Sequence, residues 1–72
     1  MTEQSEPRTP AEILKAALAR EKAARDFYGN LARSCRVDFV RELLEQLKDE
    51  ESKHIRLIQN MLTKLSSGKV PR

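Results

Sequence analysis

Two apolar stripes with heptad spacing constrain the fold of this chain, and polar groups interrupt each stripe near its centre. The members of the first stripe are Leu14, Ala17, Glu21, Ala24, Tyr28 and Leu31. The members of the second stripe are Val40, Leu44, Leu47, Glu51, His54, Ile58, Met61 and Leu65. Steps of three and four residues keep side chains on one face of an α-helix, where they pack against a neighbouring helix. The pattern therefore predicts two amphipathic helices whose inward faces carry Glu21, Glu51 and His54.

Carboxylates that lie among leucines need a compensating charge. Moving a carboxylate out of water costs several kcal/mol even after the surroundings relax. Proteins usually offset this cost with an opposite charge or a bound metal ion. Glu21 and Glu51 are therefore candidate metal ligands, and His54, about one helical turn after Glu51, is the third.

The length of the chain indicates that its core needs support. A chain of 72 residues forms at most one domain, and a core of this size rarely supplies more than about 3–5 kcal/mol of stability. Cys35 is the single cysteine, so there can be no intrachain disulfide. Oligomerisation and metal binding are the remaining sources of stability. Cys35 has no histidine near it in sequence, and we expect it to be an unreactive thiol.

Composition argues against two classes of partner. Charged residues make up 35% of the chain and aromatic residues 4%, which is typical of a small helical protein with solvated outer faces. Basic and acidic residues are interspersed, so we expect no nucleic-acid partner despite a net charge of +3. No apolar run reaches about 18 residues and no signal-peptide core is present, so we expect a cytoplasmic protein without membrane contact.

Local signals predict where the first helix begins. Residues 1–8 hold no large apolar side chain after the first methionine and are predicted to be a flexible tail. Thr9 and Glu12 have the spacing of a capping box, with Pro10 at the first helical position. The first helix is therefore expected over residues 10–33 and is expected to continue through Gly29.

The second helix follows after a short polar segment. Asp38 is expected to be its N-cap, and the helix is predicted over residues 39–65. The pair Ser66 and Ser67 with the following glycine should end it. The helical hairpin then spans residues 9–66, and residues 67–72 are predicted to be a second flexible tail.

The short connection also predicts the register of the two helices. Its centre lies near Arg36, so in an antiparallel hairpin residue 21 lies level with residue 51. One hairpin then presents Glu21, Glu51 and His54 together at mid-height, as half of a two-metal site. A two-fold dimer would supply four carboxylates and two imidazoles, whose negative charge two divalent ions would neutralise. We therefore expect an all-α fold, an antiparallel two-helix hairpin that dimerises into a four-helix bundle with two ions per dimer.

The residue types also bear on the identity of the metal and on its surroundings. An oxygen-rich ligand set favours iron over zinc, and manganese fits nearly as well. Tyr28 lies roughly 10.5 Å along the helix from Glu21. It is interpreted equally as a core residue or as a hydrogen-bond donor to the ligands. Glu50, rotated by about 100° from Glu51, is expected to face solvent or the entrance of the site.

The same residues resemble a known family. The stretch EKAARDFYGNLA, which begins at Glu21, and the segment from Glu50 to His54 resemble the repeated half of rubrerythrin and of the ferritin-like di-iron superfamily. The similarity covers about residues 12–62. It implies a ferritin-like bundle with a di-iron centre, in which Glu21 is a terminal or bridging ligand, Glu51 a bridging ligand and His54 a terminal one. Members of the superfamily oxidise ferrous iron or reduce peroxide.

Encapsulated ferritins are similar in design, because each of their subunits also carries half of the metal site. The resemblance therefore implies a homodimer or higher homo-oligomer that acts as a ferroxidase-type oxidoreductase on Fe(II) with oxygen or peroxide. The segment SSGKVPR does not look like a strong docking peptide for a shell protein. Enclosure of this protein by a shell protein therefore stays an open alternative. The Cys-rich rubredoxin domain of rubrerythrins has no counterpart here, so a self-contained rubrerythrin peroxidase is not expected.

A second interpretation stays open at this point. The two stripes would also form a metal-free helical dimerisation module without catalysis. In that module His54 would be an ordinary interface histidine, while Glu21 and Glu51 would reach past the edge of the stripe into water.

Overall fold

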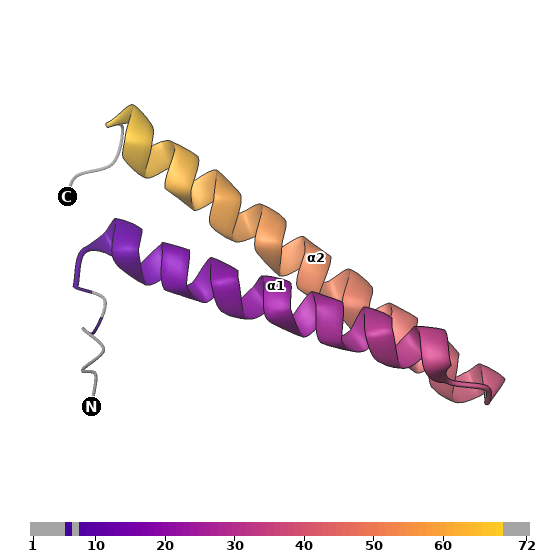
Figure 1. The fold of residues 1–72 in the computed structure, drawn as a ribbon. Coiled ribbons are helices and arrows are strands. Elements are labelled where there is room, and N and C mark those ends of the chain that lie inside the picture. Colours follow the sequence, from indigo (N-terminus) through magenta and orange to yellow (C-terminus); the bar gives the residue numbers. More distant parts are fainter. Residues whose placement is uncertain (1–5, 7, 69–72) are drawn as a thin grey trace, which may run out of the picture.

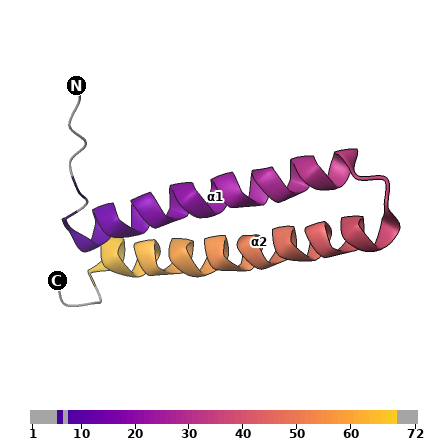
Figure 2. The same ribbon diagram turned by 90° about the horizontal axis from the view of Figure 1, so that it is seen from below.

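The protein is an antiparallel hairpin of two α-helices, which confirms the expected all-α fold. The computed structural model describes residue 6 and residues 8–68. Helix α1 spans Pro10–Ser34 and helix α2 spans Asp38–Ser67. The helices lie side by side and are joined at one end, while the start of α1 and the end of α2 lie at the other (Figures 1 and 2). The predictions for residues 1–5, 7 and 69–72 lie outside the described residues.

Helix α1 begins at the predicted capping box. The Thr9 hydroxyl accepts a hydrogen bond from the Glu12 backbone N–H at 3.1 Å. The Glu12 carboxylate accepts from the backbone N–H groups of Thr9 at 3.1 Å and of Arg8 at 2.9 Å. The bond from Arg8, followed by that from Thr9, lowers the pKa of Glu12. These bonds satisfy amides that have no partner inside the helix, so local sequence alone determines where α1 starts.

Replacing Thr9 with alanine is expected to lower the free energy of unfolding by about 0.5–2 kcal/mol, because the N-cap acceptor is lost. Urea unfolding at one protein concentration measures the change. Thr9→Ser is the matched control, because serine keeps the hydroxyl acceptor. Equal unfolding midpoints for the alanine and serine variants would contradict this role of Thr9.

The connection and the ends of the helices follow local chemistry, with one correction. The helix continues through Gly29, as expected, and a Cβ there would lie 3.6 Å from Lys48 Cδ, an ordinary contact distance. The predicted N-cap of α2 is wrong: Val37 occupies that position without a side-chain hydrogen bond, and Asp38 is the first helical residue. Asp38 instead binds the Arg41 guanidinium at 2.7 Å, and Arg41 also donates to the Cys35 carbonyl at 3.1 Å. Arg41 therefore links the connection to the first turn of α2.

The end of α2 is set by Gly68. This C-cap residue has a φ of 73° in the left-handed region, which glycine adopts without the steric strain of a Cβ. Its backbone N–H donates to the Leu65 carbonyl at 3.2 Å. The glycine that the sequence indicated as a stop signal therefore ends the helix, but Ser66 and Ser67 are its last two residues, so the predicted end at residue 65 and a tail from residue 67 are corrected.

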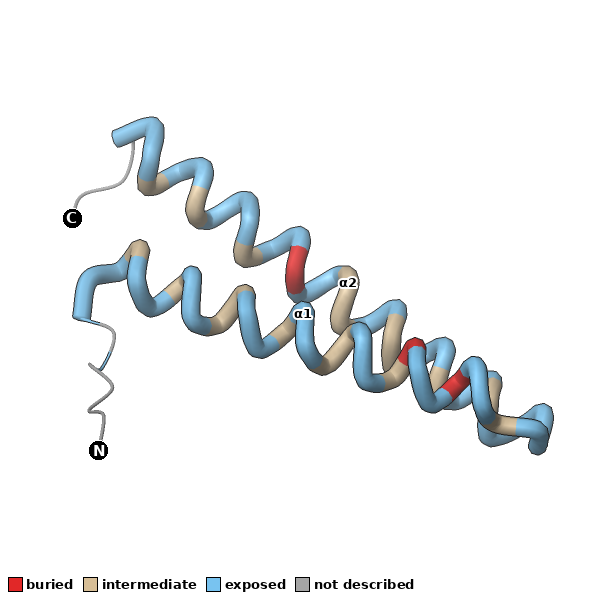
Figure 3. The backbone as a smooth tube through the Cα atoms, in the orientation of Figure 1, coloured by how far each residue is buried: buried red, intermediate tan, exposed pale blue. Residues whose placement is uncertain are grey.

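The core between the two helices is small. Among the described residues, the buried apolar side chains are Ala32, 2% exposed, and Ile55, 6% exposed. Half-buried positions recur every three to four residues on the sides of α1 and α2 that face each other, and the outer sides are exposed (Figure 3). Each fully buried aliphatic side chain contributes about 1.5–3 kcal/mol, so an isolated hairpin of this kind has little to offset its loss of conformational entropy.

Much of the apolar surface lies on one exposed side of the hairpin. The exposed large apolar residues are Ile13, Phe27, Leu31, Val37, Phe39, Val40, Leu43, Leu57 and Met61. Most of them fall in a second heptad register on each helix, running from Ile13 through Phe27 to Leu31 and from Val40 through Leu57 to Met61. Ile13 and Met61 line one hollow, which indicates that the two registers share a side. We call this surface the exposed apolar face.

The rotation of the two helices separates members of the predicted stripes. Leu31, Val40 and Met61 were expected to face a partner helix in a four-helix bundle, and in the single hairpin they are 40%, 36% and 44% exposed. The helices are rotated so that Ala32 and Ile55 take the inward positions instead. Neither helix of the described region is both long and apolar enough to cross a membrane.

Candidate metal centre

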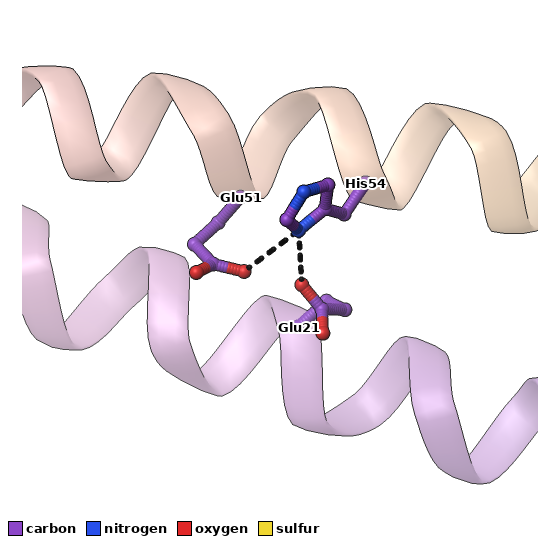
Figure 4. A group of neighbouring side chains, drawn as sticks. All are labelled: Glu21, Glu51 and His54. Atoms are coloured by element: carbon purple, nitrogen blue, oxygen red, sulfur yellow. Dashed lines mark hydrogen bonds and ion pairs between the residues drawn. The ribbon is translucent and has the colours of Figure 1, made fainter.

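Glu21 from α1 and the pair Glu51 and His54 from α2 converge partway along the hairpin (Figure 4). One potential ligand atom from each lies within 4.8 Å of the others. The His54 Nδ1 atom lies 3.0 Å from Glu21 Oε1 and 3.5 Å from Glu51 Oε1. The antiparallel register expected from the centre of the connection therefore brings these three residues together.

The three side chains differ in their exposure. Glu51 and Glu21 are 19% and 28% exposed, whereas His54 is 50% exposed. An inward position in the bundle was expected for all three; in the single hairpin Glu21 and Glu51 are half-buried, whereas His54 lies on the exposed side. The physical reason is the rotation of α2, which buries the next residue, Ile55, between the helices. His54 consequently lies in the heptad register of the exposed apolar face, with its Nδ1 atom directed back at the carboxylates.

The two carboxylates influence each other's protonation in opposite directions. A hydrogen bond with Glu51 lowers the pKa of Glu21, and a second bond with His54 lowers it further. The same contact raises the pKa of Glu51, and desolvation together with the negative charge of Glu21 adds to the effect. Placing two carboxylates this close therefore favours retention of a proton on Glu51 when no cation lies between them.

The histidine responds to the same neighbours. The hydrogen bond with Glu21 raises the pKa of His54, and desolvation opposes this increase only in part. Without metal, a protonated His54 would supply a counter-charge for the carboxylates, and its raised pKa favours that form. A divalent cation would take over that role, and it needs the Nδ1 lone pair free of its proton.

Metal affinity is expected to fall as the pH is lowered from about 8 to about 5.5, because protons compete for His54 Nδ1. The metal-free protein should respond in the opposite direction. A raised pKa stabilises the folded state below the ordinary histidine pKa, and this contribution is lost as the pH rises through the raised value.

Two measurements check this expectation: competition of the protein with a chromogenic chelator for Zn²⁺, and thermal melting of the metal-free protein, each across that pH range. His54→Gln is the control, and its melting should lose the component due to histidine. A Zn²⁺ affinity that does not change with pH would contradict the role of His54.

The other residues singled out from the sequence lie outside this cluster. The half-buried Tyr28 stacks edge-on against Phe27 with ring centroids 5.5 Å apart. Within residues 8–68 no hydrogen bond joins Tyr28 to the three ligands, so its role stays a prediction. Glu50 is 54% exposed and lies 3.8 Å from Lys53. The Cys35 thiol contacts the Val37 carbonyl in the connection.

The donor chemistry of the cluster suits a divalent first-row metal ion. Two carboxylate oxygens and one imidazole nitrogen are ligands that Fe(II) and Mn(II) accept, whereas structural zinc sites favour thiolates and histidines. Three candidate ligands on the edge of an exposed face leave coordination positions for further ligands.

The two heptad stripes described in the sequence analysis were sufficient to find these three residues. Those stripes did not indicate the exposed apolar face beside the three residues. That face could have been found from the second heptad register, which is offset by one residue and contains Phe27 and Leu57.

Comparison with known proteins gives one match. The family model described as Rubrerythrin matches residues 12–72, a range that contains both helices and all three candidate ligands. No curated protein and no solved structure matches the chain.

Proposed function

The chain belongs to the rubrerythrin family, and on that premise we propose that two copies form a ferritin-like di-iron centre that oxidises ferrous iron. The convergence of Glu21, Glu51 and His54 on the edge of the exposed apolar face carries the proposal. A single hairpin supplies half of the ligands that ferritin-like di-iron bundles use. A second copy related by a two-fold axis supplies the other half.

The exposed apolar face supports the second copy as the partner. Its large apolar side chains continue along both helices above and below His54, with Phe27 57% and Leu57 60% exposed. Covering such side chains is worth about 1.5–3 kcal/mol each. Because a two-fold dimer buries the side chains of this register on both copies, it would also build the core that the single hairpin lacks.

Charge balance supports a pair of metal ions at the centre of that dimer. Glu21 and Glu51 from two chains bring a formal charge of −4, which two ferrous ions neutralise while the imidazoles stay neutral. Removal of the metal would leave four carboxylates close together, and within one hairpin the proximity of Glu21 already raises the pKa of Glu51. Manganese has the same charge and similar ligand preferences, so the same residues suit it.

Ferrous iron is the substrate in this proposal. Two Fe(II) ions lose one electron each, and the two electrons with two protons convert oxygen to hydrogen peroxide, or hydrogen peroxide to two waters. The carboxylates of Glu21 and Glu51 hold the ions and favour the increase in positive charge on oxidation. His54 completes the ligand set through Nδ1, and it must release its proton before an ion binds.

Anaerobic loading of the wild-type protein with Fe(II) is expected to give about one iron per chain, as a site shared by two chains requires. Exposure of the loaded protein to oxygen or hydrogen peroxide should then produce ferric absorbance faster than the same iron in buffer. Equilibrium sedimentation of the same sample should show a species of at least two chains. Absence of retained iron in a well-formed dimer would instead support the metal-free dimerisation module.

A further inference from the structure

The orientation of the His54 ring leaves one polar atom without a function in the site. Nδ1 is directed at the carboxylates of Glu21 and Glu51, while the second ring nitrogen, Nε2, points away from both (Figure 4). A neutral imidazole that binds an ion through Nδ1 carries its proton on Nε2. Histidine ligands almost always donate that second N–H to a carboxylate, a carbonyl or water, which determines the tautomer and orients the ring.

Within its own helix, His54 has one neighbouring carboxylate besides Glu51 that could serve as that acceptor. Side chains of an α-helix lean toward its N-terminus, so the His54 ring lies over the preceding turn, which carries Glu50 four residues earlier. Glu50 and His54 also share the heptad register of the exposed apolar face. The neighbours in that register, Leu47 and Leu57, have no acceptor on their side chains, and Lys53 is a donor.

The present contacts of Glu50 leave its carboxylate free to accept a hydrogen bond from His54 Nε2–H. Its carboxylate is 54% exposed, and its ion pair with Lys53 is long at 3.8 Å, beyond hydrogen-bond distance. A lone carboxylate on an apolar face would be costly to cover with a second copy. A hydrogen bond with a histidine N–H would offset part of that cost.

We propose that Glu50 is a positioning residue that accepts a hydrogen bond from Nε2–H of His54 when His54 binds a metal ion through Nδ1. This inference rests on the proposed metal site, and it adds a residue that does not itself bind the ion. The Glu50 carboxylate selects the tautomer that leaves Nδ1 unprotonated, and it holds the ring in the orientation already seen in the hairpin.

The first test is Zn²⁺ affinity, measured by chelator competition in wild type, Glu50→Ala, Glu50→Gln and Glu42→Ala. Loss of a partner of this kind typically lowers metal affinity by about 10–100-fold, and that loss is expected for Glu50→Ala. Glu50→Gln should lie between Glu50→Ala and wild type, since its amide oxygen still accepts. Glu42→Ala is the matched control, because it removes an exposed glutamate of the same helix. Its affinity should equal that of wild type.

The second test reads the hydrogen bond itself. In the Zn²⁺-loaded, ¹⁵N-labelled protein, the Nε2–H proton of His54 is expected to exchange slowly with water in wild type and in Glu42→Ala. Its signal should be lost to exchange in Glu50→Ala. Equal Zn²⁺ affinity and an unchanged Nε2–H signal in Glu50→Ala would overturn the role of Glu50 while the metal site stands. Failure of the wild type to bind Zn²⁺ or Fe(II) would overturn both proposals.

Discussion

Replacing His54 with alanine is expected to abolish iron oxidation and to lower metal affinity by at least about 100-fold, the upper limit for losing a partner that only supports a ligand. The side chain is 50% exposed, and its contact with the other helix is the polar one between Nδ1 and Glu21 at 3.0 Å, so no buried apolar packing is lost. The variant should therefore fold like the wild type, and its loss of activity can be assigned to the site. Anaerobic Fe(II) binding and the rate of ferric absorbance after addition of oxygen measure the effect.

Glu51→Gln separates binding from stability at the same site. It removes the carboxylate whose pKa Glu21 raises, so it should also abolish iron oxidation. Because like-charge repulsion is relieved, the metal-free protein should be as stable as wild type or more stable near neutral pH. If Glu51 is a metal ligand, the variant should lose iron oxidation while the metal-free protein keeps or gains stability. An ordinary interface glutamate does not predict that combination.

The control for both variants is Asp49→Ala, which removes an exposed carboxylate of the same helix. Its iron binding and oxidation rate should match those of wild type. If His54→Ala and Asp49→Ala retain the same amount of iron, the ion binds to surface carboxylates and the proposed centre is wrong.

Replacing Leu57 with aspartate is expected to weaken the dimer by at least about 1,000-fold. Leu57 is 60% exposed in the hairpin, so the change removes little contact within one chain. A two-fold dimer loses two leucines, each worth about 1.5–3 kcal/mol, and gains two carboxylates that resist desolvation. Sedimentation over a range of protein concentrations measures the affinity, and the melting temperature of the variant should lose its dependence on concentration.

Asn60→Asp is the matched control for charge, since it adds one carboxylate at an exposed position outside both heptad registers. It should dimerise as the wild type does. A wild-type protein that sediments as a single hairpin at micromolar concentration would contradict the dimer, and with it the completed di-iron centre.

Short-range chemistry explains why much of this architecture could be predicted. The capping box of Thr9 and Glu12 and the left-handed Gly68 mark helix ends through contacts between residues close in the sequence. A short connection between antiparallel helices leaves almost no freedom in their register. For that reason Glu21 was expected level with Glu51, and the structure brings both within reach of the His54 imidazole. The roles of these residues in binding metal are still predictions.

The rotation of each helix about its axis was decided by tertiary packing. Two overlapping heptad registers, one residue apart, are both apolar enough to face a partner: Leu44 and Ile58 belong to one, Leu43 and Leu57 to the other. Spacing alone does not say which register packs inside the hairpin, because each satisfies the same periodicity. Burial of Ile55 between the helices resolved the choice, and it moved His54 to the exposed apolar face.

The two helices, the start of α1, the glycine that ends α2 and the level at which three polar groups meet were thus determined by the amino-acid sequence, because local hydrogen bonds and a short connection leave few alternatives. Tertiary structure decided which apolar side chains stay exposed and where the imidazole points. Both depend on how the side chains of the two helices fit together. Rotating a helix about its axis by one residue buries a similar apolar area, so only the packing of the two helices selects one rotation.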